Sequence, residues 1–159
     1  MKKFIVSIDA GTTSNRAILF DLKGKPVFSS QKEFTQYFPK SGWVEHDPEE
    51  IWRTTVKILR DVIAKAKKLK GKILTIGITN QRETTVLWDK KTGKTVYRAI
   101  VWQDRRQADY CKKLKNQNKE TLIFNKTGLP IDSYFSGTKI KWILDNVPLA
   151  KKLMNKKQL

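Results

Sequence analysis

Hydrophobic and polar positions alternate with two different periods along this chain. Apolar runs rich in β-branched and aromatic residues predict strands at 4–8, 17–20 and 26–34, joined by short polar turns, and so an antiparallel meander. The acid and proline of Asp47-Pro48 are typical of a helix start, and apolar positions three or four apart predict a helix to about Lys67. The inward face of this helix is expected to comprise Ile51, Trp52, Val56, Leu59, Val62, Ile63 and Ala66.

The second half of the chain continues this mixture of strands and helices. Residues 73–78 are almost wholly apolar, which predicts a strand inside a sheet that is covered on both faces. Further strands are expected at 86–88 and 96–102, and helices at 103–115, 120–125, 139–145 (with Ile140, Ile143 and Leu144 inward) and from Pro148. Neither a repeat nor a change in composition marks a domain boundary, so the pattern predicts one α/β domain.

Composition narrows the class of protein. With 39% hydrophobic and 10% aromatic residues the chain can form a packed core, and the formal charge of +18 favours anionic partners. The lysines are scattered over solvent-facing helix positions, so we interpret the charge as a solvated surface and do not expect nucleic acid as a partner. The single cysteine, Cys111, excludes an internal disulfide. No apolar run reaches the roughly 18 residues that span a bilayer, so we expect no membrane insertion and a cytoplasmic protein.

One stretch, Asp9 to Arg16, carries the first candidate chemistry. It places an acid, a glycine and several hydroxyls in a turn between two strands, where backbone N–H groups can bind phosphates and a carboxylate can hold a hydrated metal ion. A Walker A loop is excluded because Trp88 stands where its first glycine belongs, and no Gly-x-Gly-x-x-Gly sequence is present. An ordinary hairpin explains the same residues equally well.

Five segments in order along the chain resemble a known family. They are Asp9-Ala-Gly-Thr-Thr-Ser-Asn-Arg16, Gly42-Trp-Val-Glu-His-Asp-Pro48, Gly77-Ile-Thr-Asn-Gln-Arg-Glu-Thr-Thr85, Ala99-Ile-Val-Trp-Gln103 and Tyr134-Phe-Ser-Gly-Thr-Lys139. Together they resemble the amino-terminal part of the glycerol kinases, which belong to the sugar kinases with an actin-like ATPase fold. The resemblance implies an α/β fold, with an actin-like, ribonuclease-H-like mixed sheet flanked by helices and an incomplete amino-terminal lobe over residues 1–159.

The resemblance also implies roles for individual residues, with ATP and Mg²⁺ as cofactors and glycerol as the substrate. Asp9 would position the metal, while Thr12, Thr13, Ser14 and Arg16 would contact the nucleotide phosphates. We call these five the phosphate-side residues. The glycerol pocket would be lined by Arg82, Glu83, Trp102 and Tyr134, which we call the glycerol-side residues. The reaction implied is transfer of a phosphoryl group from ATP to a terminal hydroxyl, which gives sn-glycerol 3-phosphate.

Chemistry is consistent with these roles, although each residue also has a plainer interpretation. A small triol offers little apolar area, so an enzyme must recognise it by oriented donors and acceptors beside an aromatic wall. Without the resemblance, Arg82 and Glu83 would be interpreted as a surface ion pair, and Trp102 and Tyr134 as core aromatics.

The chain departs from the family pattern at two points. Ala10 stands where glycerol kinases commonly have glutamine. The aspartate that acts as catalytic base is expected beyond Leu159, together with the carboxy-terminal lobe, so no catalytic residue is expected here and the chain is expected to be inactive alone. The alternatives are another polyol or sugar kinase of the same family and a non-catalytic truncated product. The protein partner is expected to be either a second copy of this chain or a complementary carboxy-terminal chain.

Overall fold

The computed structural model describes all residues from Met1 to Leu159 and divides them into two compact units. The first unit comprises Met1–Thr35 and Glu49–Gln81, and the second comprises Gln36–Pro48 and Arg82–Leu159. The chain therefore leaves the first unit after Thr35, returns to it at Glu49 and leaves it again after Gln81. None of the helices combines the length and the apolar character needed to cross a membrane.

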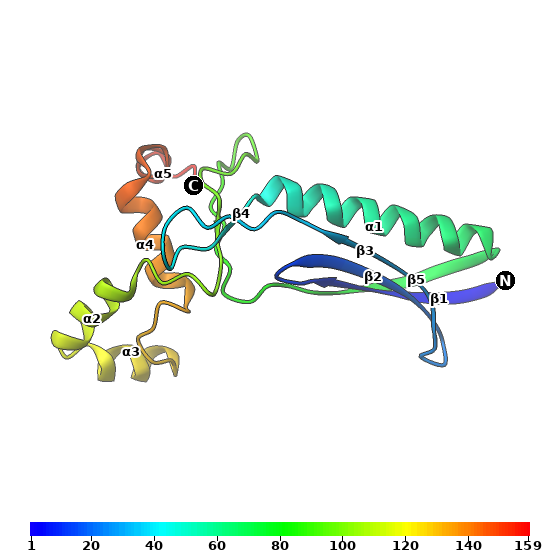
Figure 1. The fold of residues 1–159 in the computed structure, drawn as a ribbon, viewed down its shortest axis with the longest axis horizontal. Helices are drawn as coiled ribbons and strands as arrows, with labels where there is room; N and C mark the ends of the chain where they lie inside the picture. Colours follow the sequence, from blue (N-terminus) through cyan, green and yellow to red (C-terminus); the bar gives the residue numbers. More distant parts are fainter. The chain divides into compact units, whose positions relative to one another are not determined.

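A four-stranded mixed sheet forms one layer of the first unit. Its strands are β1 (Lys2–Ala10), β2 (Ser14–Asp21), β3 (Pro26–Glu33) and β5 (Gly71–Thr79), in the order β3-β2-β1-β5 (Figure 1). β1, β2 and β3 are antiparallel neighbours, which confirms the predicted meander. β5 runs parallel to β1 after a crossover through a helix, the connection that a parallel pair requires.

Helix α1 (Pro48–Lys68) covers one face of this sheet (Figure 1). Phe4, Val6 and Ile8 alternate inward along β1, and they form a buried core with Ala17 and Leu19 of β2 and with one face of α1. The buried residues of α1 are Thr54, Ile58, Val62 and Ala66, four residues apart. The start and the end of the helix match the prediction within one residue.

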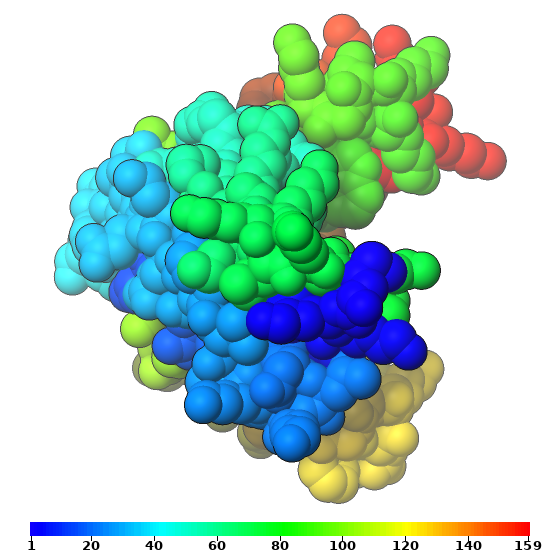
Figure 2. Space-filling view, turned by 90° about the vertical axis from the view of Figure 1, so that its right-hand side faces the viewer, coloured from blue at the N-terminus to red at the C-terminus, as the bar shows by residue number.

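Two sequence-based expectations about this unit are wrong. Trp52 was expected to face inward but is 64% exposed, because it lies about 200° around the helix from Thr54. The strand at 73–78 was expected inside a covered sheet, whereas β5 is an outer strand with Leu74, Ile76 and Ile78 exposed. Apolar residues on both faces of a strand do not specify its position in the sheet. Figure 2 shows the green residues after α1 beside the blue N-terminal strand at the surface.

The regular structure of the second unit is mainly helical. Its elements are β4 (Glu45–His46), β6 (Ala99–Ile100), α2 (Ala108–Asn116), α3 (Glu120–Thr127), α4 (Ser136–Asn146) and α5 (Pro148–Asn155). β4 and β6 form a short antiparallel pair, and a small core gathers around Ile100, Ile143 and Ala150. The predicted helices at 120–125 and from Pro148 are confirmed as α3 and α5.

Several predicted boundaries in this unit differ from the structure. The strands expected at 86–88 and 96–102 are reduced to β6 and to isolated bridges at Thr85 and Trp88. α2 begins at Ala108 rather than at 103, because Asp104 turns inward and accepts hydrogen bonds from the backbone N–H groups of Val44 and Arg106 and from the Arg106 side chain. α4 begins at Ser136 rather than at 139, and the expected inward residue Ile140 is exposed, while Lys139 beside it is fully buried.

Candidate functional site

The phosphate-side residues lie where β1 turns into β2 in the first unit. Asp9 near the end of β1 is paired across the ladder with Arg16 of β2. An Arg16 Nη2 hydrogen donates to Asp9 Oδ2 at 3.3 Å, and both side chains are nearly half exposed. The acid and the cation therefore lie together beside the turn, still open to solvent. Thr12 and Thr13 form the turn and Ser14 begins β2, so all five residues occupy one hairpin.

Gly11 gives this turn its shape. Its N–H donates to the carbonyl oxygen of Ser14 at 3.0 Å. A Cβ at position 11 would lie 2.8 Å from that same oxygen, which is closer than side-chain carbons come to backbone atoms. The close approach therefore requires glycine and leaves the turn free of a side chain at this point, which suits a loop that binds phosphates through its backbone.

Asn15 fixes the hairpin to α1, a role that the sequence analysis missed. Its side chain is fully buried, and Asn15 Nδ2 lies within hydrogen-bond distance of the Ile51 carbonyl oxygen (3.0 Å), Thr54 Oγ1 (2.8 Å) and Thr55 Oγ1 (2.9 Å). The signal was present in the sequence, because position 15 alternates with the inward positions 17 and 19. A polar residue at an inward strand position requires partners, and here the helix provides them.

The structure is compatible with Mg²⁺ at Asp9 in only one mode of binding. No group of three or more acidic, histidine or cysteine side chains is arranged to hold a metal ion. Mg²⁺ usually keeps several waters and is bound by one or two carboxylates together with substrate phosphates. A single, partly exposed carboxylate beside a glycine-shaped turn fits that mode, in which Asp9 would hold the hydrated ion and the nucleotide would provide the other oxygens.

All four glycerol-side residues belong to the second unit. Glu83 adopts a backbone φ of +63°, which is uncommon for a residue with a side chain. Its carboxylate oxygen Oε2 accepts hydrogen bonds from the Ser136 N–H at 2.8 Å and the Ser136 hydroxyl at 2.7 Å. Both bonds end on the same oxygen, and Oε1 takes no part in them. Glu83 is therefore half-buried and oriented, unlike the surface acid of the plainer interpretation.

The two aromatic glycerol-side residues are in contact with each other. The ring centroids of Trp102 and Tyr134 lie 6.0 Å apart in an edge-to-face arrangement, and the two residues are 36% and 37% exposed. They are thus not the core aromatics of the plainer interpretation. Glu83 binds Ser136, two residues after Tyr134, so it contacts the same segment of the chain as Tyr134. The Arg82 side chain is exposed. The structure brings Glu83, Trp102 and Tyr134 to one region.

A cavity of about 470 Å³ in the second unit adjoins this region. Its lining is mainly apolar, from α2, α3 and the segment before α4. Glu83 is the one glycerol-side residue that lines it, together with its partner Ser136.

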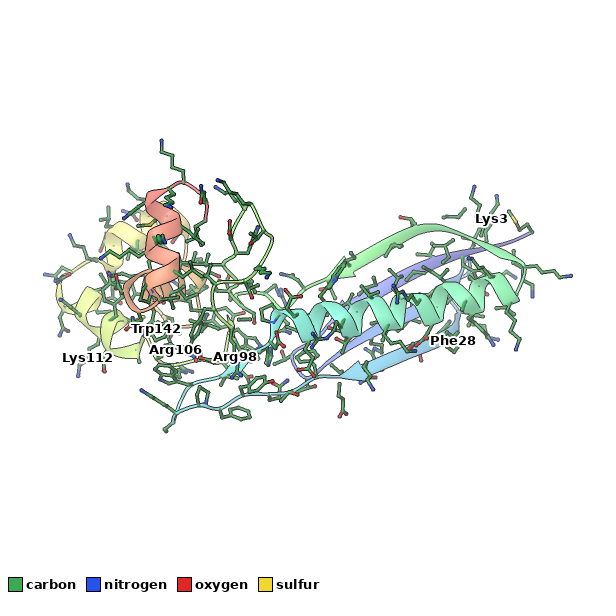
Figure 3. All side chains as sticks on the ribbon, turned by 90° about the horizontal axis from the view of Figure 1, so that it is seen from above. Lys3, Phe28, Arg98, Arg106, Lys112 and Trp142 are labelled. Carbon is green, nitrogen blue, oxygen red and sulfur yellow. The ribbon has the colours of Figure 1, made fainter.

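A buried ionic cluster lies elsewhere in the second unit, and no pattern in the sequence predicted it. The Arg106 side chain is fully buried, and Nη2 lies 2.8 Å from Glu45 Oε1 and 2.8 Å from Asp104 Oδ2. Its guanidinium carbon is 3.7 Å from the ring centroid of Trp43. The same carbon is 4.5 Å from the ring centroid of Trp142, which is labelled beside Arg106 in Figure 3. Burial tends to lower the pKa of Arg106, but the hydrogen bonds that its guanidinium donates to Asp104 and Glu45 raise this pKa above its ordinary value.

The same cluster holds two backbone segments. Asp104 Oδ2 accepts the Val44 N–H at 2.7 Å, and the Tyr97 hydroxyl donates to Glu45 Oε1 at 2.6 Å. Burial and the bond to Glu45 raise the pKa of Tyr97, so this hydroxyl keeps its proton. Residues 42–48 are therefore joined to the segment that leads into α2.

Comparison with known proteins gives consistent results. A family model, the N-terminal domain of the FGGY family of carbohydrate kinases, matches residues 4–158. The chain is 60% identical over 151 residues to a glycerol kinase from Alkaliphilus metalliredigens, covering 95% of this chain and 30% of that relative. It is 58% identical over 159 residues to a glycerol kinase from Alkaliphilus oremlandii, covering 100% of this chain and 32% of that relative. The chain thus spans about a third of the length of these relatives.

Solved structures agree with the sequence comparison. The crystal structure of Plasmodium falciparum glycerol kinase with ADP has a TM-score of 0.92 and 36% identity, covering 99% of this chain and 31% of that chain. Gluconate kinase from Lactobacillus acidophilus has a TM-score of 0.86 and 26% identity, covering 96% of this chain and 30% of that chain.

Proposed function

This chain belongs to the FGGY family of carbohydrate kinases, and we propose that it carries the phosphate-side and glycerol-side residues of an ATP-dependent glycerol kinase. The observation that carries the proposal is the likeness to curated glycerol kinases, which extends over the whole chain and so includes the segments that hold both sets. ATP as the cosubstrate also fits a cytoplasmic location.

In the first unit, the turn around Gly11 would bind the nucleotide phosphates. Backbone N–H groups and the hydroxyls of Thr12, Thr13 and Ser14 are suited to phosphate oxygens, and Arg16 adds a positive charge beside them. When bound, Mg²⁺ neutralises charge on the transferring phosphoryl group, and Asp9 would hold its water shell.

In the second unit, Glu83 and the two aromatic rings would bind glycerol. Oε2 of Glu83 is held by Ser136, so Oε1 is oriented to accept a hydrogen bond from a glycerol hydroxyl. Arg82 would donate to a hydroxyl oxygen, and Trp102 with Tyr134 would contact the carbon chain. The base that takes the proton from the reacting hydroxyl is not among these residues.

Glu83→Gln is expected to lower kcat/KM for glycerol by about 10- to 150-fold, because hydrogen bonds to charged groups contribute about 1.5–3 kcal/mol. The assay uses a joined protein, in which residues 1–159 are followed by the rest of the Alkaliphilus metalliredigens relative beyond the matched region. The matched control is Glu120→Gln, since Glu120 is 59% exposed and 3.8 Å from Lys115. Equal kcat/KM values for the two variants would show that Glu83 does not bind glycerol.

The alternative is a kinase of the same family that acts on another polyol or sugar. The likeness to a gluconate kinase supports this alternative. Comparison of kcat/KM for glycerol, erythritol, xylulose and gluconate in the joined protein decides between them. The proposal predicts preference for glycerol, and a larger value for any of the other three would replace it.

A further inference from the structure

Helix α4 lacks a capping side chain of its own. The residue before it is Phe135, whose side chain makes no capping hydrogen bond, so the first-turn N–H groups need acceptors from elsewhere. Glu83 provides one, because Oε2 accepts both the N–H and the hydroxyl of Ser136. A carboxylate is favoured at this end of a helix by the helix dipole. The glycerol-side acid is thus tied to the start of α4.

The next turn of α4 carries a lysine in an unusual place. Lys139 is fully buried, and its ammonium group donates a hydrogen bond to the carbonyl oxygen of Tyr134. Its Nζ also lies 5.9 Å from the centroid of the Tyr134 ring. Lysine is almost never fully buried unless it is paired, and this one is directed toward a glycerol-side residue rather than toward solvent.

From these contacts we infer that Ser136 and Lys139 are positioning residues for the glycerol site, with Ser136 orienting Glu83 and Lys139 fixing the backbone of Tyr134. The inference rests on the proposed function for the identity of the ligand. It assigns a task to two residues of α4 that do not themselves bind the substrate.

Burial and nearby acidic groups have opposite effects on the charge of Lys139. Burial lowers the pKa of Lys139 from 10.5 to about 8, while the nearby carboxylates of Glu83, Asp104 and Asp132 and the Cys111 thiol favour the charged form. Between pH 8 and 10.5 the unfolded chain would therefore bind more protons at this site than the folded chain. Stability from this group rises with pH across that window, and the charged form is the destabilising one.

The ligand-free 159-residue chain provides the first test, by NMR of the backbone amides of Tyr134 and Ser136 and of the Trp102 indole N–H. Lys139→Met keeps an unbranched side chain but cannot donate, and is expected to shift these signals. Lys141→Met is the matched control, because Lys141 on the same helix is exposed and pairs with Asp145 at 2.7 Å. Unchanged Tyr134 and Trp102 signals in a folded Lys139→Met chain would overturn the inference.

The dependence of stability on pH provides a second measurement. A lysine of ordinary pKa would leave the stability difference between wild type and Lys139→Met independent of pH. The ratio of unfolding constants, wild type over Lys139→Met, is expected to fall on the order of 100-fold between pH 7 and 11. A ratio that does not vary with pH would contradict a buried, titrating ammonium. If Lys139→Met does not fold, Ser136→Ala replaces it, and an unmoved Glu83 carboxylate signal in that variant overturns the inference.

Glycerol titration of the same samples separates this inference from the proposed function. Wild type and Lys141→Met are expected to show the same dissociation constant at the Trp102 indole signal, and Lys139→Met one at least 10-fold weaker. Equal binding by all three would overturn the positioning role. Absence of binding by every sample would count against a glycerol site in this chain, while the ligand-free spectra would still decide the roles of Ser136 and Lys139.

Discussion

Arg106→Met is expected to lower the free energy of unfolding of the second unit by about 3–5 kcal/mol. The substitution removes the cation between Glu45 and Asp104, whose side chains are 3% and 0% exposed. Two carboxylates would then remain buried without their shared partner. Methionine would fill much of the space between Trp43 and Trp142, so the loss is attributed to uncompensated charge rather than to a cavity.

Urea unfolding followed by tryptophan fluorescence measures this effect, because Trp43 and Trp142 lie against the arginine. The neighbouring residue provides the control. Arg105 is 67% exposed and 4.0 Å from Asp132, so Arg105→Met is expected to change stability by less than about 1 kcal/mol. Similar losses of unfolding free energy for the two variants would show that burial does not determine how much the Arg106 cluster contributes to stability.

Asp9→Asn is expected to reduce kcat of the joined protein by at least about 100-fold. Asparagine keeps the size of the side chain but removes the negative charge that would hold hydrated Mg²⁺. Metal ions contribute several kcal/mol of transition-state stabilisation, and each 1.4 kcal/mol corresponds to a tenfold change in rate. The backbone of the turn should persist, because the close approach of Gly11 to Ser14 does not involve the Asp9 side chain.

The control for this prediction is an acid on the same hairpin. Asp21 ends β2 at the opposite end from the turn and accepts the Lys23 and Lys25 N–H groups. Asp21→Asn is expected to change kcat by less than about threefold, since surface substitutions away from a site have small effects. A rate for Asp9→Asn within threefold of wild type at saturating Mg²⁺ would exclude Asp9 as the metal-holding residue.

Local patterns predicted the elements that depend on local chemistry. The meander, α1 and the turn at Gly11 follow from strand alternation, an N-terminal Asp-Pro signal and a glycine between apolar runs. The resemblance assigned the candidate site residues to two sets, and the structure brings Glu83, Trp102 and Tyr134 of the glycerol-side set to one region.

Features that depend on contacts between distant segments were not predictable in this way. The burial of Lys139 and Arg106 was missed, because a charged residue in a helix or turn is normally solvated. One of the two acids that pair with Arg106, Glu45, also lies far away in sequence. The outer position of β5 was missed for a related reason. An apolar sequence indicates that a strand can be buried, but it does not specify how many neighbouring strands or covering helices the strand has.

The central claim is tested most directly by formation of sn-glycerol 3-phosphate from glycerol, ATP and Mg²⁺, measured side by side for the joined protein and for the 159-residue chain. We predict product from the joined protein and none above a no-enzyme control from the chain alone, because phosphoryl transfer depends on groups positioned around the whole reaction centre. A folded joined protein that forms no product would contradict the glycerol kinase assignment, and product from the chain alone would contradict the account of which residues the reaction needs.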